Sequence, residues 1–238
     1  MNFFLEGVRQ AWQLIIGGDA SLWQITGVTL QVAAVSTGIA LVLGLPAGLA
    51  LGLGRFRGRR LGLAIANAGL GLPPVVVGLV LALLMFPAAP LGGLHLLFTL
   101  RGVFVAQTLL ALPIVVALTA SAVRSTAGAL LEQARAFSAS TLQISWLALR
   151  EARIGILAAI IAAVGSALSE VGAVVLVGGN IAGSDQTLAS AALQRVDAGQ
   201  FSEGLAIGII LLVLIGIVAA ALTAVQYWDG RSGARERG

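Results

Sequence analysis

The sequence predicts an all-α, polytopic membrane protein with about five transmembrane helices, and three observations support this prediction. The mean hydropathy is +1.01 and only 10% of the 238 residues are charged, whereas about a quarter of the residues in soluble domains are charged. Five apolar stretches reach the roughly 20 residues that a helix needs to cross a bilayer. These stretches are long and unbroken, which argues against the short alternating strands of a membrane β-barrel.

Residues 1–22 precede the first apolar stretch and have a helical pattern of their own. Phe3, Phe4, Val8, Trp12 and Ile15 recur at roughly helical spacing, which favours an amphipathic helix lying in the outer membrane interface. A helix packed against the bundle would show the same pattern, so both alternatives stay open. The segment lacks the basic start and the small-residue cleavage site of a signal peptide.

The membrane domain is expected over residues 23–228, followed by a short tail over 229–238. Its five predicted spans cover residues 25–53, 62–86, 99–123, 154–177 and 204–226. The chain has 31 glycines, and Pro46, Pro73, Pro74 and Pro113 lie inside these spans. Membrane helices tolerate such residues when neighbouring helices satisfy the freed backbone groups. We therefore expect closely packed helices with kinks, and the glycine-rich run "GLALGLGRFRG" from Gly48 fits helix packing better than a phosphate loop.

The arginines predict the orientation, because short cytoplasmic loops carry an excess of basic residues. All 14 basic residues are arginine, and Arg9, Arg101 and Arg195 fall on one side of the predicted spans. The other eleven fall on the opposite side: Arg55, Arg57, Arg59, Arg60, Arg124, Arg135, Arg150, Arg153, Arg231, Arg235 and Arg237. This distribution predicts an external N-terminus and a cytoplasmic C-terminus. Trp23, Phe98, Tyr227 and Trp228 stand at span ends, where an aromatic belt is expected.

A polar segment, "LLEQARAFSASTLQISWLALREARIG" over residues 130–155, interrupts this apolar chain with five charges. It lies in the predicted cytoplasmic region 124–153. Leu130, Leu131, Ala134 and Phe137 form an apolar stripe, and "SAS" offers a break and a new N-cap, so two short helices are expected. They form either an amphipathic hairpin covering the base of the bundle or a docking surface for a soluble partner.

The same segment resembles the EAA motif of permease subunits of bacterial ATP-binding-cassette importers. Glu132, Ala134, Ala139 and Ser140 match the motif, while Gln133 replaces an alanine, Ser138 a glycine and Arg150 a proline. The stretches "GLPPVVVGLVLALL", "APLGGLHLLFT", "AQTLLALPIVVALTASAV" and "ALSEVGAVVLVGGNI" are similar to the tungstate-type permeases, relatives of the molybdate permeases. The resemblance covers about residues 23–226.

The resemblance implies a type I importer permease in the bacterial cytoplasmic (inner) membrane, with cytoplasmic coupling helices. It implies a homodimer that binds two ATPase subunits and receives an oxyanion, tungstate or molybdate, from an external binding protein. The residues that it assigns to ATPase coupling are Glu132, Gln133, Ala134, Phe137, Ser138, Ala139 and Ser140. Ser138 puts the tightness of the turn in question, because glycine adopts backbone angles that serine avoids. The missing proline at Arg150 suggests that helix continues further towards the fourth span.

The chain cannot hydrolyse ATP through a P-loop, because that site needs a lysine and the sequence has none. We expect no cofactor, no nucleic-acid partner and no metal site: the chain has no cysteine, and His95 has no second ligand nearby. We therefore expect the chain to be a transport subunit embedded in membrane lipid and not an enzyme, with ATP hydrolysed by a separate ATPase subunit.

The predicted translocation path or gate comprises Pro73, Pro74, Glu170, Gly172, Asn180 and Thr187. Glu170 is the one carboxylate well inside a predicted span, and such residues face a bundle interior or an aqueous cavity. A carboxylate repels a dianion, so we expect Glu170 to act as a gate or an interhelical lock, with a simple hydrogen-bonded helix contact as the alternative. The competing functions are a secondary transporter, a permease for another small anion or solute, and a membrane enzyme.

Overall fold

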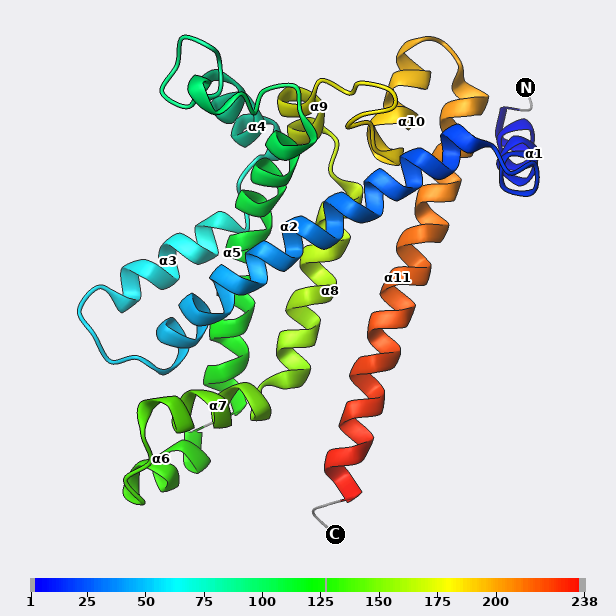
Figure 1. The fold of residues 1–238 in the computed structure, drawn as a ribbon. Coiled ribbons are helices and arrows are strands. Elements are labelled where there is room, and N and C mark those ends of the chain that lie inside the picture. Colours follow the sequence, from blue (N-terminus) through cyan, green and yellow to red (C-terminus); the bar gives the residue numbers. More distant parts are fainter. Residues whose placement is uncertain (1–2, 127, 236–238) are drawn as a thin grey trace. The chain divides into compact units, whose positions relative to one another are not determined.

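The computed structural model describes residues 3–126 and 128–235, and within these residues the chain forms helices and no strand (Figure 1). The side chains of Phe3, of residues 126–131, which include Leu130 and Leu131, and of all residues from 227 onward, which include Tyr227, Trp228 and the arginines of the tail, lie outside the described residues. The all-α prediction is confirmed. The elements are α1 (Phe3–Ile16), α2 (Ala20–Leu53), α3 (Arg59–Gly69), α4 (Pro74–Leu84), η1 (Gly92–Leu94), α5 (Leu100–Thr126), α6 (Gly128–Ala136), α7 (Thr141–Glu151), α8 (Arg153–Ser169), α9 (Gly172–Gly178), α10 (Leu188–Asp197) and α11 (Phe201–Arg235).

The helices belong to two compact units, each assembled from three separate stretches of chain. Unit 1 comprises Met1–Ser36, Pro73–Thr108 and Gly165–Val218, and unit 2 comprises Thr37–Leu72, Leu109–Val164 and Ala219–Gly238. The long helices α2, α5, α8 and α11 each contribute residues to both units.

Three of the five predicted spans are single long helices. α2, α5 and the part of α11 up to Gln226 are each long and apolar enough to cross a membrane. The number rises to five if each of two bent helix pairs counts as one span: α3 with α4, bent by 101°, and α7 with α8, bent by 69°. α2, α5 and α11 contain the predicted spans 25–53, 99–123 and 204–226 almost completely. The prediction of about five transmembrane helices is therefore confirmed.

The other two predicted spans, 62–86 and 154–177, are each interrupted, which is a sharper departure from a straight helix than the kinks that the sequence analysis expected. The first break separates α3 from α4, and the second leaves Glu170 and Val171 outside regular helix between α8 and α9. At the first break, Pro73 is the extended N-cap and Pro74 is the first residue of α4. A proline at the first helical position loses no helical hydrogen bond, because the amide of that position has no partner inside the helix. The same two prolines cannot continue a helix from the preceding residues.

In unit 1, the two short helices after the breaks, α4 and α9, pack against each other through small residues. A Cβ atom on Gly78 of α4 would lie 2.6 Å from Ala173 Cα, and one on Gly172 would lie 2.5 Å from Val75 Cγ2. Both distances are shorter than a carbon–carbon contact allows. The backbones can therefore approach this closely only because these positions lack side chains, as in other membrane helix pairs.

In unit 2, α2 and α5 pack through a stripe of glycines. Gly44, Gly48 and Gly52, each one turn apart, face Val115, Thr119 and Val123, with ideal Cβ positions 2.7, 2.7 and 3.0 Å from the nearest of these side-chain atoms. This confirms that the run from Gly48 serves helix packing. The contacts follow the same order along both helices, so α2 and α5 run parallel here. A parallel direction is required here, because α2 and α5 contain the first and third predicted spans and one further crossing of the membrane lies between them.

Unit 2 also contains a cap for the end of α2. Arg59 donates from Nε to Leu51 O at 2.8 Å and from Nη2 to Gly52 O at 3.3 Å. These carbonyls belong to the last turn of α2, where no helical amide can reach them. A cation at this end also opposes the negative end of the helix dipole. Arg59, which the sequence analysis used only as a topology signal, therefore has a specific structural role.

We expect Gly78→Ala to lower the stability of the folded protein by about 1–3 kcal/mol, because the added methyl meets backbone that cannot move aside as a side chain can. Gly27→Ala in α2 is the matched control, since a Cβ there has no neighbour within 4 Å. Thermal unfolding of the purified variants in one detergent provides the comparison. Equal unfolding temperatures for Gly78→Ala and Gly27→Ala would contradict the close α4–α9 contact.

Candidate functional site

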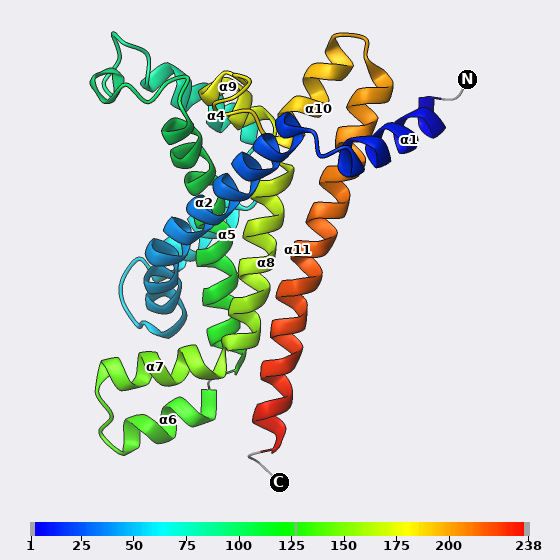
Figure 2. The same ribbon diagram turned by 45° about the vertical axis from the view of Figure 1, so that its right-hand side comes forward.

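All seven predicted coupling residues lie in one helical hairpin formed by α6 and α7 (Figures 1 and 2). Glu132, Gln133 and Ala134 belong to α6, Phe137 and Ser138 form the turn, and Ala139 and Ser140 lead into α7. The two expected short helices are therefore present. α7 continues past Arg150 to Glu151, as the absence of a proline at that position suggested.

The turn of the hairpin places Ser138 in the left-handed region, with φ of 59°. Ser138 N donates to Arg135 O at 3.0 Å and Ala139 N donates to Ala134 O at 3.0 Å, which together make a Schellman motif. The position at which the motif favours glycine is thus occupied by serine in the backbone conformation that glycine adopts most easily. α10 ends in the same way, with Gly199 at φ of 77° and Gln200 N donating to Arg195 O at 2.8 Å.

The second helix of the hairpin has its own N-terminal cap. Ser140 Oγ accepts a hydrogen bond from Gln143 N at 3.3 Å, and Gln143 Oε1 accepts one from Ser140 N at 2.8 Å. This reciprocal pair is a capping box, which satisfies two amides that no helical carbonyl reaches. The chain can therefore start α7 immediately after the turn, which keeps the hairpin short.

The hairpin has one packed face and one exposed face. Ala148 and Ala152 are fully buried and cluster in unit 2 with Val123 of α5 and Ile156 of α8. Phe137, Leu142 and Trp146, by contrast, are 86%, 80% and 69% exposed. Exposed aromatic side chains of this size typically mark a contact surface. We refer to these three side chains as the hairpin ridge.

Four of the predicted path residues come together at the α4–α9 contact in unit 1. Pro73 and Pro74 begin α4, Gly172 begins α9, and Glu170 lies in the break before α9. Glu170 does not lie inside a continuous helix, contrary to the expectation. Its Oε1 accepts a hydrogen bond from Ala173 N at 3.1 Å, so the carboxylate satisfies an amide that the interruption of the helix leaves without a helical partner.

The remaining two path residues, Asn180 and Thr187, meet at the start of α10. Asn180 has φ of 56° and donates from Nδ2 to Ser190 O at 3.4 Å. Thr187 is the N-cap of α10 and forms a capping box with Ser190. Leu188 N donates to Thr29 Oγ1 at 2.9 Å, so this end of α10 is tied to α2.

The loop between α9 and α10 also contains an ionisable residue that the sequence analysis did not single out. Asp185 is fully buried, and its Oδ1 accepts a hydrogen bond from Ile181 N at 2.6 Å. Its Oδ2 is buried without a hydrogen-bond partner. Burial raises the pKa of this carboxyl group, because the ion loses its hydration. The signal that could have revealed it is a single acidic residue among the turn residues of "IAGSDQT".

His95 is exposed and has left-handed backbone, with φ of 49° at the end of η1. Among the residues that the structure describes, no three His, Cys, Asp or Glu side chains gather in a way that could hold a metal ion.

These observations define the class of protein: a polytopic helical membrane protein with paired broken helices in one unit and an exposed two-helix hairpin in the other. Residues 44–227 match the family described as binding-protein-dependent transport system inner membrane component. The chain therefore belongs to this family, whose members are transport proteins of the inner membrane.

Individual relatives agree with this assignment. The chain is 40% identical over 225 residues to a probable anion ABC transporter permease protein of Haloferax volcanii, across 91% of this chain and 97% of that protein. It is 29% identical over 226 residues to the tungstate uptake system permease protein TupB of Peptoclostridium acidaminophilum, across 95% and 99% of the two chains. An inward-facing structure of the MetNI methionine ABC transporter has the same fold, with a TM-score of 0.69 at 20% identity over 93% of this chain and 98% of that one.

We expect Ser138→Gly to stabilise the hairpin by about 1 kcal/mol and Ser138→Val to destabilise it by more, because left-handed backbone is unfavourable for residues with a Cβ. Hydrogen–deuterium exchange of residues 128–151 provides the measurement. Gly199→Ser is the matched control, since it makes the reverse change in the equivalent turn after α10 and should speed exchange there. Slower exchange in Ser138→Val than in the parent protein would show that the left-handed backbone of Ser138 does not destabilise the hairpin.

We expect the stability of the protein to fall as pH rises because of Asp185. A folded-state pKa above the ordinary value means that the folded protein binds this proton more tightly than the unfolded chain. The contribution is therefore complete below the ordinary carboxyl pKa and is lost as pH rises through the raised value. Asp185→Asn removes this dependence while its Oδ1 still accepts from Ile181 N, whereas Asp185→Ala loses that bond at every pH.

Apparent unfolding temperatures of the parent protein, Asp185→Asn and Asp185→Ala at pH 5 and pH 8 test this expectation. The difference between the parent and Asp185→Asn isolates Asp185 from all other titrating groups. The same change between the two pH values in both proteins would show that burial of Asp185 has no effect on stability.

Proposed function

We propose that this chain is the permease subunit of an ATP-driven importer for an oxyanion, with tungstate as the first candidate and molybdate as the second. Membership of a binding-protein-dependent family supports an external binding protein as the source of substrate. The similarity over almost the whole length to a named tungstate permease supports the substrate class. The probable anion permease at 40% identity is consistent with an anion and keeps another small anion as the alternative.

The hairpin ridge supports a separate ATPase as the source of energy. The sequence contains no lysine and hence no P-loop, so nucleotide hydrolysis of that kind must come from another polypeptide. The hairpin offers exposed Phe137, Leu142 and Trp146 on one side, while Ala148 and Ala152 fix its other side in the core of unit 2. A displacement of the ridge would therefore be passed to α5 and α8 through these buried contacts. In this proposal Glu132, Gln133, Ala134, Ser138, Ala139 and Ser140 form the rest of the ATPase contact.

The proposed assembly is a homodimer of this chain with two ATPase subunits and one external binding protein. Five crossings are few for enclosing a path, which favours two copies. The arginine distribution supports an N-terminus outside and the hairpin in the cytoplasm. The α4–α9 pair is the proposed gate, in which Glu170 fixes the break by holding Ala173 N rather than by binding the dianion. Asn180 and Thr187 would position the adjoining loop.

Uptake into proteoliposomes that contain this permease and its cognate ATPase tests the function. Tungstate should enter only when ATP and the binding protein are both supplied, and unlabelled molybdate should compete more strongly than sulfate. Preferential competition by sulfate would favour the alternative anion. Flux driven by an ion gradient without the ATPase would instead identify a secondary transporter.

We expect Phe137→Ala to weaken ATPase binding about tenfold or more, because a large exposed aromatic residue is a typical anchor of an interface. The variant should remain folded, since this side chain is 86% exposed and contributes little to the core. Phe4→Ala on α1 is the matched control, because it removes the same side chain from a surface that is 66% exposed. Co-purification of the ATPase with each variant provides the measurement, and unchanged binding in Phe137→Ala would place the ATPase contact elsewhere.

A further inference from the structure

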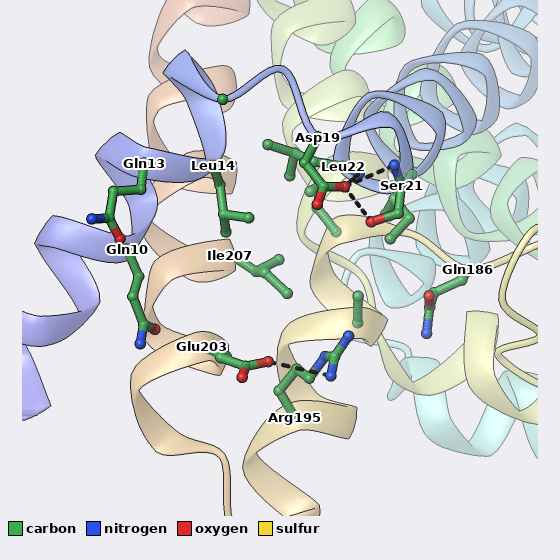
Figure 3. Close-up of a pocket in the computed structure, with 14 residues that line it drawn as sticks. Gln10, Gln13, Leu14, Asp19, Ser21, Leu22, Gln186, Arg195, Glu203 and Ile207 are labelled. Carbon is green, nitrogen blue, oxygen red and sulfur yellow. Dashed lines mark hydrogen bonds and ion pairs between the residues drawn. The ribbon is translucent and has the colours of Figure 1, made fainter.

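A cavity of about 500 Å³ lies within unit 1, among α1, the start of α2, α10 and the start of α11 (Figure 3). Its apolar side includes Leu14, Leu22 and Ile207, and its polar side includes three amides and three charges. Figures 1 and 2 both show α1 beside the start of α11. Gly17 and Asp19, where the chain turns from α1 into α2, also line the cavity. Neither the path residues nor the hairpin ridge contributes to its lining.

The apolar side of the cavity is preformed by the core of unit 1. Leu22 and Ile207 are 6% and 8% exposed and cluster with Ala11, Leu188 and Ile210. A Cβ on Gly7 would lie 2.8 Å from Leu205, so α1 lies close against α11. α1 therefore packs against α11 within unit 1, and the cavity lies beside this contact.

The polar side is rich in hydrogen-bond acceptors. Gln10 Oε1 is buried and has no hydrogen-bond partner. Asp19 caps α2 by accepting from Ser21 N and Leu22 N, and the hydrogen bonds from the Ser21 hydroxyl and from Leu22 N hold its pKa below the usual value, so it stays ionised. Arg195 lies 3.2 Å from Glu203 and also donates to Gln200 at 3.0 Å, so the one cation of the lining is already engaged.

The charges of the lining residues favour a ligand with a positively charged group. The two carboxylates, Asp19 and Glu203, outnumber the single guanidinium of Arg195 among the lining residues, so a purely anionic ligand would be repelled. An ammonium group would be attracted, and it would supply the donor that Gln10 Oε1 lacks. A phosphate next to the ammonium could share Arg195, because a guanidinium with five N–H donors can serve two partners.

The position of the cavity selects the kind of molecule that carries these charges. The outward face of α1 leaves Phe4, Leu5, Val8, Trp12 and Ile16 between 43% and 66% exposed. In a protein of the inner membrane, such a face is solvated by lipid at the bilayer surface. The cavity lies on the opposite face of the same helix, lined there by Gln10, Gln13 and Leu14. A helix at the bilayer surface therefore places the cavity near the level of the phospholipid headgroups, with an apolar wall available for the start of an acyl chain.

We propose that this cavity binds an aminophospholipid through its headgroup, with the primary ammonium at Gln10 and Glu203 and the phosphate at Arg195, while Asp19 adds negative charge to the same lining (Figure 3). The bound lipid joins α1 to α10 and α11, so it stabilises unit 1. The inference depends on membrane location and not on the transported substrate, and its test requires no transport measurement.

Native mass spectrometry of the purified, delipidated full-length protein tests the proposal. Phosphatidylethanolamine should bind at least about tenfold more tightly than phosphatidylglycerol, which lacks the ammonium, a difference of roughly 1.4 kcal/mol. Phosphatidylethanolamine should also bind more tightly than phosphatidylcholine, whose trimethylated nitrogen has no N–H donor. Equal binding of the three lipids would overturn the proposal.

Two variants and one control assign the binding to this cavity. Gln10→Leu should lower ethanolamine-lipid binding without affecting phosphatidylglycerol. Glu203→Gln removes one carboxylate and releases Arg195, so it should shift the preference towards phosphatidylglycerol. Glu6→Gln removes the same charge from an exposed position of α1 outside the lining and should change nothing. Circular dichroism establishes that each variant is folded, and unchanged lipid preference in both folded cavity variants would overturn the assignment.

Soluble phosphoethanolamine separates a lipid from a free solute with the same charges. The lipid should raise the unfolding temperature of the protein, whereas phosphoethanolamine at the same concentration should not, because it lacks the acyl chain that contacts Leu14 and Ile207. Equal stabilisation by the two would assign the cavity to a small solute and overturn the lipid proposal.

Discussion

The rest of this structure depends on one constraint, which is that every backbone amide and carbonyl in the hydrocarbon region needs a partner within the protein. An uninterrupted helix meets this requirement by itself, but each break or end exposes groups that side chains must satisfy. Arg59 holds the last carbonyls of α2, and Glu170 holds an amide at the start of α9. The side chains that satisfy these backbone groups therefore stand where helices end or break, and the proposed functional elements lie at the same kinds of position.

Small residues allow close helix contacts in the two units that contain the proposed functional elements. Glycines allow α2 to approach α5 in unit 2, and they allow α4 to approach α9 in unit 1. Interfaces of this kind resist small displacements, because any movement brings backbone against side chains. If the hairpin ridge is the ATPase contact proposed above, a displacement there would be passed to α5 and α8 through the buried cluster of Ala148 and Ala152 with Val123 and Ile156. The short α4–α9 pair, by contrast, follows two breaks and is the part of unit 1 suited to rearrangement.

Much of the fold follows from the sequence because length and hydropathy dominate in lipid. The spans containing α2, α5 and α11 were predictable, and so was the two-helix hairpin at Ser138 to Ser140, since the capping signal is local. The break at Glu170 was not, because the residues directly before it, 167–169, carry no proline or glycine signal and the run continues as apolar sequence after it. Asp185 was missed for another reason. Its burial depends on α5, whose Val103 lies beside the Gly178–Asp185 contact and is distant in sequence.

The hydrogen bond from Leu188 N to Thr29 Oγ1 has a consequence for biosynthesis. It joins residues 159 positions apart, and the surrounding cluster joins Ala11 and Leu22 of the N-terminal region to Ala206 and Ile207 of the last helix. A chain that emerges from the ribosome in order from its N-terminus cannot close this cluster until α11 has been made. α1 is thus synthesised well before it can reach its final environment, and a chain without α10 and α11 leaves α1 without the core on which it packs.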